Sequence, residues 1–168
     1  MELTFRKAVP DDAPAMAHLL TVAWQKAYRG ILSDALLDGI DEDERCGRIR
    51  SIIGQNPAFQ YYILETDGEM TGVSGVGACR DEDLPNAAEI VVFYIHPDDQ
   101  GQGLGKNLMR DTLAAIRESG SAHVALWVLR DNHNALAFYE KAGFAADGAE
   151  KTLPELENAV AVRYRYAE

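Results

Sequence analysis

The chain has 168 residues, about the length of one domain, and its 47% hydrophobic and 26% charged residues are typical of a folded globular protein. It carries 16 Lys and Arg against 27 Asp and Glu, a net charge of −11. The acidic excess is spread along the chain and no run of basic residues occurs. A nucleic-acid partner is therefore not expected, because its phosphates would be repelled.

No membrane or secretory segment is expected. The longest purely apolar stretch, residues 90–95, is far shorter than the roughly 20 residues that a helix needs to cross a bilayer. The first residues lack a basic segment followed by an apolar one. Cys46 and Cys79 lie in no metal or CxxC spacing, so we expect free thiols in a reducing cytosol. These features predict a cytoplasmic protein.

The first half of the chain is predicted to contain a strand, helices and a hairpin. Alternating apolar residues predict a strand over 3–9. Helical spacing predicts an amphipathic helix that Gly30 ends; its apolar positions are Met16, Leu19, Leu20, Ala23, Trp24 and Ala27. Residues 31–53 predict helix in two pieces, in which acids at 41–44 precede bases, as the helix dipole favours. Asp67-Gly68 predicts a hairpin between strands at 61–64 and 71–79.

The second half alternates strands and helices. A continuous β-branched and aromatic run over 88–95 predicts a central strand. Periodicity predicts helices at 104–118 and 134–142, and strands at 124–129 and 160–166. The order β, α, α, β, β, β, α, β, α, β predicts a single α/β domain over residues 1–168 with a mixed sheet.

A glycine-rich loop joins the predicted central strand to the helix that follows it. Residues 93–106 read Phe-Tyr-Ile-His-Pro-Asp-Asp-Gln-Gly-Gln-Gly-Leu-Gly-Lys. Glycines let the backbone approach a ligand, and the N–H groups of a first helical turn favour anions, so the loop predicts a phosphate or pyrophosphate site. A P-loop would need Gly at Gln100 and Ser or Thr at Asn107, and a dinucleotide fingerprint would need Gly or Ala at Lys106. For the glycines alone, an incidental β-to-α turn is the simpler interpretation.

A second motif follows the next predicted strand. Residues 130–144 read Arg-Asp-Asn-His-Asn-Ala-Leu-Ala-Phe-Tyr-Glu-Lys-Ala-Gly-Phe. With this segment, Tyr-Ile-His-Pro and the Gln-x-x-Gly-x-Gly at 100–105, residues 88–144 resemble the GNAT superfamily of N-acetyltransferases. Residues 24–32 are more weakly similar to the early helices of bacterial members. The resemblance implies a mostly antiparallel mixed sheet flanked by helices, and acetyl transfer from acetyl-coenzyme A to an amine in a ternary complex without an acyl-enzyme; no metal is expected.

The resemblance also implies a cofactor site. Backbone groups of Phe93, Tyr94 and Ile95 are implied to pair with the pantetheine arm where the strand splays from its neighbour, and Asn132 to contact that arm. The loop residues implied to bind the cofactor, chiefly through N–H groups to the pyrophosphate, are Gln100, Gly101, Gln102, Gly103, Leu104, Gly105 and Lys106. Because both the cofactor and the chain are acidic, we expect salt to improve cofactor binding modestly and a cationic amine to be the favoured acceptor.

Candidate catalytic residues follow from the same resemblance. A strand N–H near Phe93 would polarise the thioester carbonyl. Glu89 is implied to remove the amine proton through water, with a solvent-exposed strand-end carboxylate as the alternative. Tyr139, with an ordinary pKa near ~10, matches the tyrosine that protonates the leaving thiolate, although helical tyrosines are more often core. Trp127 stands where protein N-terminus acetyltransferases carry a catalytic Glu, which shifts the base role to Glu89 or an ordered water and implies an apolar acceptor wall.

The sequence leaves several alternatives open for the acceptor site and for the function. The four histidines, His18, His96, His123 and His133, have no metal-site spacing. Trp24, Tyr28 and Tyr61 are candidates for the acceptor pocket, although aromatic residues are more often core. A coenzyme A-binding sensor or dimer scaffold without turnover is the rival function, a nucleotide-binding regulator is a third, and a homodimer is compatible with each. Residues 24–60 and the last hairpin are expected to shape the acceptor site, whose amine belongs to a small molecule or a protein.

Overall fold

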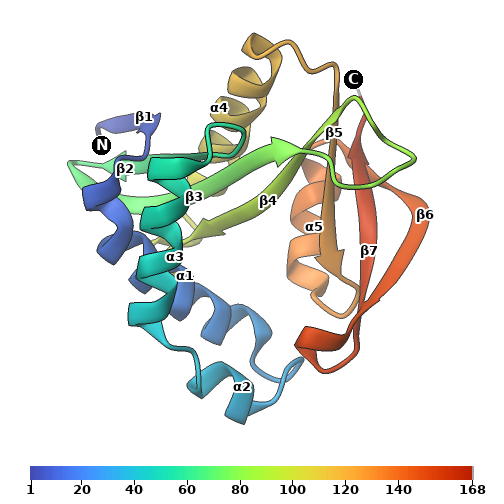
Figure 1. Ribbon diagram of the computed structural model, residues 1–168, viewed down its shortest axis with the longest axis horizontal. Helices are drawn as coiled ribbons and strands as arrows, with labels where there is room; N and C mark the ends of the chain where they lie inside the picture. Colours follow the sequence, from blue (N-terminus) through green and yellow to red (C-terminus); the bar gives the residue numbers. More distant parts are fainter. Residues whose placement is uncertain (168) are drawn as a thin grey trace.

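Seven strands form one mixed sheet in the order β1-β2-β3-β4-β5-β7-β6 in the computed structural model, which describes residues 1–167 (Figure 1). All neighbouring strands are antiparallel except β4 and β5, which are parallel. The strands are β1 (Leu3–Lys7), β2 (Gln60–Thr66), β3 (Glu69–Ala78), β4 (Ala87–Ile95), β5 (His123–Leu129), β6 (Phe144–Leu153) and β7 (Ala159–Tyr166). The predicted fold class, a mostly antiparallel mixed sheet flanked by helices, is confirmed.

Helices cover both faces of the sheet. They are α1 (Ala13–Tyr28), α2 (Asp34–Asp38), α3 (Glu42–Gln55), α4 (Leu104–Glu118) and α5 (His133–Lys141), with 3₁₀ turns at Pro10–Asp12, Pro97–Asp99 and Pro154–Leu156. One core cluster joins α1 and α3 to β2 and β3, and another joins α4 and α5 to β4, β5 and β7. A third joins the end of α1 and α2 to β5 and β7. None of the described helices combines the length and the apolar composition that a membrane span requires.

The predicted helical stretch over 31–53 is two helices because each part has its own cap. Ser33 Oγ accepts from Leu36 N at 3.1 Å and begins α2, and Asp41 Oδ1 accepts from Glu44 N at 3.0 Å and begins α3. Gly30, with φ of +85°, ends α1 in the left-handed conformation that glycine adopts easily. The end of α1 at Gly30 and the division into two helices are as predicted, whereas α2 begins at Asp34 and α3 ends at Gln55, a few residues beyond the predicted bounds.

Strand β6 was not among the predicted strands. Its sequence, Phe-Ala-Ala-Asp-Gly-Ala-Glu-Lys-Thr-Leu, is rich in residues of low β-propensity and most of its positions are exposed. Its pairing with β7, whose alternating apolar residues were recognised, makes it a strand. The register between the two shifts between Ala146 and Glu150, which disrupts the pattern further. Tertiary pairing overrides local propensity here.

Candidate active site

A cavity opens where β4 and β5 separate. The two strands pair only over Ala87–Glu89 and His123–Ala125. Just beyond, the pairing of β4 with β3 passes from Ile90 to Val92, so that Val91 is the extra residue of a β-bulge. A bulge bends a strand and increases its twist. The rest of β4 therefore has no sheet partner on its β5 side, and the splay expected at Phe93, Tyr94 and Ile95 is present.

The cavity has a volume of about 1120 Å³, slightly above the usual range of about 300–1,000 Å³ for small-molecule sites. It is lined from α1, β4, the glycine loop, α4, β5, α5 and the β6–β7 hairpin. The predicted site residues that line it are Phe93, Tyr94, Ile95, Gln100, Gly101, Gly103, Leu104, Gly105, Lys106, Asn132 and Tyr139. Gln102 and Glu89 are not among the lining residues.

The glycine loop presents unpaired N–H groups to this cavity. Gly101 and Gly103 have φ of +82° and +79°, and a Cβ at either would meet no atom within 4 Å. These two glycines are therefore required by backbone conformation and not by crowding. Helix α4 begins directly after Gly103, and within residues 1–167 the N–H groups of residues 103–106 have no hydrogen-bond acceptor. Such a helix start fits an anion.

The charges around the cavity differ from those of the whole chain. The lining contains the cations Lys26, Lys106, Arg110, Arg117 and Lys141, whereas its only acidic residue, of those described, is Asp99. An anionic ligand in the loop therefore meets a locally positive surface, although the chain carries a net charge of −11. From the sequence, only backbone N–H groups and Lys106 were candidates for holding the anion; the structure adds Lys26, Arg110, Arg117 and Lys141 to the lining.

Tyr139 lies on α5 with its ring among other aromatic rings. The centroids of Phe93 and Phe144 lie 6.2 and 6.0 Å from that of Tyr139. Burial raises the pKa of the Tyr139 phenol well above its ordinary value, and the neighbouring Tyr28 adds to the shift. The shift therefore extends to higher pH the range over which the hydroxyl stays protonated.

Two further tyrosines, Tyr28 and Tyr94, also line the cavity. Tyr28 Oη and Tyr94 Oη share a hydrogen bond of 2.8 Å, and burial raises the pKa of both groups. Trp24 packs edge-on against Tyr28, with ring centroids 5.0 Å apart. Trp24 and Tyr28 line the cavity, as one interpretation of the sequence expected, whereas Tyr61 packs in the core beneath α1 and α3.

Asn132 is both a helix cap and a cavity residue. Its side-chain oxygen accepts from Ala135 N at 3.3 Å and begins α5. Its amide NH₂ makes no hydrogen bond within residues 1–167. Asn132 can therefore hold α5 in place through one end of its amide and donate into the cavity through the other.

Glu89 is buried, so the alternative of a solvent-exposed strand-end carboxylate is wrong. It is 2% exposed. Its oxygens accept from Arg80 Nη2 at 2.6 Å, Arg80 Nε at 3.2 Å and the Arg80 backbone N at 3.2 Å. Arg80 itself remains largely in solvent, with 65% of its side chain exposed. The predicted base is therefore held by a neighbouring loop beside the cavity and not in its wall.

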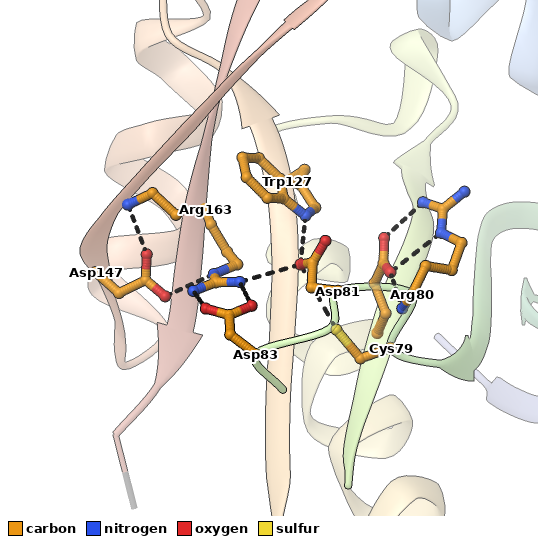
Figure 2. Close-up of polar contacts among 9 residues, drawn as sticks. Cys79, Arg80, Asp81, Asp83, Trp127, Asp147 and Arg163 are labelled. Carbon is orange, nitrogen blue, oxygen red and sulfur yellow. Dashed lines mark hydrogen bonds and ion pairs between the residues drawn. The ribbon is translucent and has the colours of Figure 1, made fainter. Parts of the chain in front are cut away.

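Trp127 belongs to a polar network that sequence reasoning did not find (Figure 2). Its Nε1 donates to Asp81 at 2.9 Å, and Asp81 also accepts from Arg163 Nη1 at 3.2 Å. Arg163 further binds Asp83 at 2.7 Å and Asp147 at 2.6 Å. The loop between β3 and β4 is thus tied across β5 to β7 and β6. No local pattern could have indicated a contact between residues about 80 positions apart.

The wall at Trp127 is also not simply apolar. Nζ of Lys151 lies 4.1 Å from the centroid of the Trp127 ring.

Within residues 1–167 no group of three or more His, Cys, Asp and Glu side chains is placed to hold a metal ion.

Comparison with known proteins finds a matching family model, sequence relatives and solved structures with a similar fold. Residues 13–144 match the model of the acetyltransferase (GNAT) family. A probable N-acetyltransferase of Mycobacterium tuberculosis is 29% identical, over 97% of this chain and 92% of its own length. A putative [ribosomal protein bS18]-alanine N-acetyltransferase of Bacillus subtilis is 31% identical over 58% of this chain and 61% of its own length. The crystal structure of PaiA N-acetyltransferase from Thermoplasma acidophilum, in complex with coenzyme A, superposes with a TM-score of 0.78 at 19% identity, covering 99% of this chain and 100% of the other.

Proposed function

Because the chain belongs to the acetyltransferase (GNAT) family, it transfers an acetyl group from acetyl-coenzyme A to an amine, and we propose that this is a cationic primary amine of a small molecule or protein. The main support for the proposal is that two chemically different surfaces line the same cavity. The glycine loop, α4 and α5 bring N–H groups and cations, whereas α1 and β5 bring the aromatic rings of Trp24, Tyr28 and Trp127. An anionic and an amine substrate can therefore meet at the free edge of β4.

The cofactor side of the cavity fits acetyl-coenzyme A. The N–H groups of residues 103–106 would take the pyrophosphate, with Lys106, Arg110 and Arg117 supplying positive charge. The free backbone edge over 93–95 would pair with the pantetheine arm, and the amide of Asn132 would contact it. When bound, the cofactor supplies an acetyl group activated as a thioester.

The chain's own residues supply three functions for direct attack in a ternary complex. A β4 N–H within 93–95 would polarise the acetyl carbonyl oxygen as it gains charge. Glu89 would receive the amine proton through an ordered water, because its carboxylate does not line the cavity. Tyr139, kept protonated by burial, would donate its proton to the sulfur that leaves. Its position in the wall beside Phe93 supports this role.

The acceptor proposal rests on the chemistry of the cavity wall. Aromatic faces attract ammonium groups, and the rings of Trp24, Tyr28 and Trp127 line the cavity. Among proteins similar to this one, one is described as a spermidine N(1)-acetyltransferase, from Thermoplasma acidophilum, at 20% identity. Others are described as mycothiol and ribosomal-protein-alanine acetyltransferases, so the relatives differ in the molecule that their names give.

The test is release of coenzyme A thiol from acetyl-coenzyme A in the presence of a broad panel of amines, with acetylated products identified by mass. We expect acceptor-dependent thiol release that saturates with both substrates. Saturable cofactor binding without release across the panel would favour a coenzyme A sensor.

The free thiols of Cys46 and Cys79 fit the expected cytoplasmic location.

A further inference from the structure

The loop between β3 and β4 holds two residues of the proposed acceptor site with two consecutive side chains. Arg80 binds Glu89 through Nη2 at 2.6 Å and through Nε at 3.2 Å. Asp81, the next residue, accepts a hydrogen bond of 2.9 Å from Trp127 Nε1 (Figure 2). Adjacent positions of one loop therefore hold the proposed base and an aromatic residue of the cavity wall.

Glu89 and Trp127 lie on the same face of the sheet, where β4 and β5 separate. Glu89 is the last β4 residue that pairs with β5, and its partner is Ala125. Side chains alternate along a strand, so Trp127, two residues after Ala125, points to the same face. Arg163 is the β7 partner of Trp127 and shares this face. The loop is therefore bonded to three strands at the point where the cavity opens.

Asp81 fixes the orientation of the Trp127 ring. An indole has a single donor, Nε1, and within residues 1–167 this donor bonds to Asp81 alone. The χ2 torsion of tryptophan has two broad preferred regions, so a ring turned over would lose this bond. Arg163, whose side chain is only 7% exposed, donates to the same Asp81 oxygen at 3.2 Å. One ring orientation is thus selected by a carboxylate that is itself held in place.

The orientation of this ring affects the cavity. Trp127 lines the cavity together with Trp24 and Tyr28. It packs against the core cluster that contains Tyr28 and Leu129, two further lining residues. Asp81 is not among the lining residues, so it can influence an acceptor through the ring that it holds.

We propose that Asp81 is a positioning residue for the acceptor amine, because it fixes the Trp127 ring in the acceptor wall beside the proposed base Glu89. The inference rests on the proposed acetyl transfer to an amine and adds the β3–β4 loop to the acceptor side of the site. This loop precedes β4, whereas the glycine loop follows it. A change at Asp81 should therefore alter acceptor kinetics and leave cofactor binding unchanged.

Steady-state kinetics with benzylamine, and with the fastest amine of the panel, test this role. Asp81→Ala should raise the amine KM and lower kcat/KM by roughly 10- to 100-fold, the cost of a misplacement of about 1 Å, with unchanged coenzyme A affinity by calorimetry. Asp81→Asn keeps an oxygen that can accept from Nε1 and should retain most of the activity. Asp83→Ala is the control, because Asp83 lies in the same loop and binds Arg163 at 2.7 Å without touching Trp127. It should leave the amine kinetics unchanged.

Two further measurements distinguish positioning from a general loss of structure. In a Trp127→Phe background, which has no Nε1, Asp81→Ala should cause little additional loss, because residues that act together are not additive. The chain has two tryptophans, so Trp24→Phe identifies the indole N–H signal of Trp127 in ¹H–¹⁵N spectra. That proton should exchange with solvent faster in Asp81→Ala than in the wild-type protein or in Asp83→Ala.

Failure of the inference and failure of the proposed function give different results. The inference is overturned if the wild-type protein acetylates an amine and Asp81→Ala does so equally well, or if Asp81→Ala and Asp83→Ala lose the same activity. Full additivity of Asp81→Ala and Trp127→Phe would also overturn it. Coenzyme A binding without thiol release from any amine by the wild-type protein would instead overturn the proposed function.

Discussion

Gly105 and Phe138 bring the two motifs of the site into contact. A Cβ on residue 105 would lie 3.0 Å from the Phe138 ring, closer than ordinary packing allows, so glycine lets the first turn of α4 lie directly against α5. The next residue of α5 is Tyr139. The glycine loop and the proposed proton donor therefore line one cavity.

Gly103→Ala should weaken coenzyme A binding and also destabilise the fold. Gly103 has φ of +79°, where a side chain costs about 1–2 kcal/mol, and the added methyl enters the space of the proposed pyrophosphate. Gly120→Ala is the matched control, because Gly120 has φ of +94° and equally open surroundings but does not line the cavity. Calorimetry should show weaker binding only for Gly103→Ala, while urea unfolding shows similar losses for both. Equal cofactor affinity in the two variants would argue against the loop as the phosphate site.

Tyr139→Phe should lower kcat by roughly 100-fold, the range of general acid catalysis, with coenzyme A affinity nearly unchanged. Because the pKa of Tyr139 is raised by burial, wild-type activity should show no loss from its ionisation up to at least about pH 10. Tyr164→Phe is the control, since the Tyr164 hydroxyl bonds to Glu140 at 3.2 Å and does not line the cavity. Wild-type kcat in Tyr139→Phe across the pH range would remove this residue from the mechanism.

Glu89→Gln should depress the rate most at low pH, where neutral amine is scarce and a base matters most. The amide keeps the shape of the carboxylate and its oxygen can still accept from Arg80, which limits damage to the fold. The measurement is kcat/KM against pH for a single amine, in the variant and the wild-type protein. Superimposable profiles would show that water removes the proton without Glu89.

Salt should weaken coenzyme A binding, the reverse of what the net charge of −11 predicts. The cations Lys106, Arg110, Arg117 and Lys141 line the cavity that contains the proposed pyrophosphate site. Their attraction for an anion is screened by salt, with a Debye length of about 10 Å at 0.1 M. We expect a loss on the order of 10-fold between low salt and ~0.5 M. Calorimetric titration checks the direction, and affinity that rises with salt would mean that the global acidity dominates.

Arg163→Met should destabilise the fold by about 3 kcal/mol, because it leaves the mostly buried carboxylates of Asp81 and Asp147 without their cation. Arg110→Met, which breaks an exposed pair with Asp111, should have no measurable effect. Urea unfolding at neutral pH compares the two. A small loss in Arg163→Met would show that the β3–β4 loop is held by other contacts.

Acid should release the ion pairs made by arginines in the wild-type protein. Hydrogen bonds from Arg163 and Arg6 lower the pKa of Asp83 and Asp12 respectively. A lowered folded-state pKa stabilises the fold above the unfolded value near ~3.9, and this stabilisation is lost as the pH falls through the folded value. Melting temperature should therefore be insensitive to these groups between about pH 5 and 7 and fall below about pH 4. A decline that begins near neutrality would have to come from other residues.

Much of the fold could be predicted because its signals are local. Caps, glycines and apolar periodicity are properties of neighbouring residues, so α1, the two following helices, the hairpin and the central strand were predicted close to their observed bounds. The glycine loop and the Asn132 segment were likewise recognisable as contiguous motifs. Strand β6 was missed, since its residues form a strand only through pairing with β7.

The sequence by itself determined the fold class and the family of the chemistry, because both depend on short-range pattern and on two contiguous motifs. Only the tertiary structure decided the electrostatics of the site. It placed five cations around a cavity in an acidic chain and buried Glu89 beside Arg80. It also placed Lys151 Nζ and Arg163 Cζ 4.1 and 5.7 Å from the centroid of the Trp127 ring. Charge acts through space over several ångströms. Strand order and packing therefore determine which charged residues surround the site, and the net charge of the chain does not reveal them.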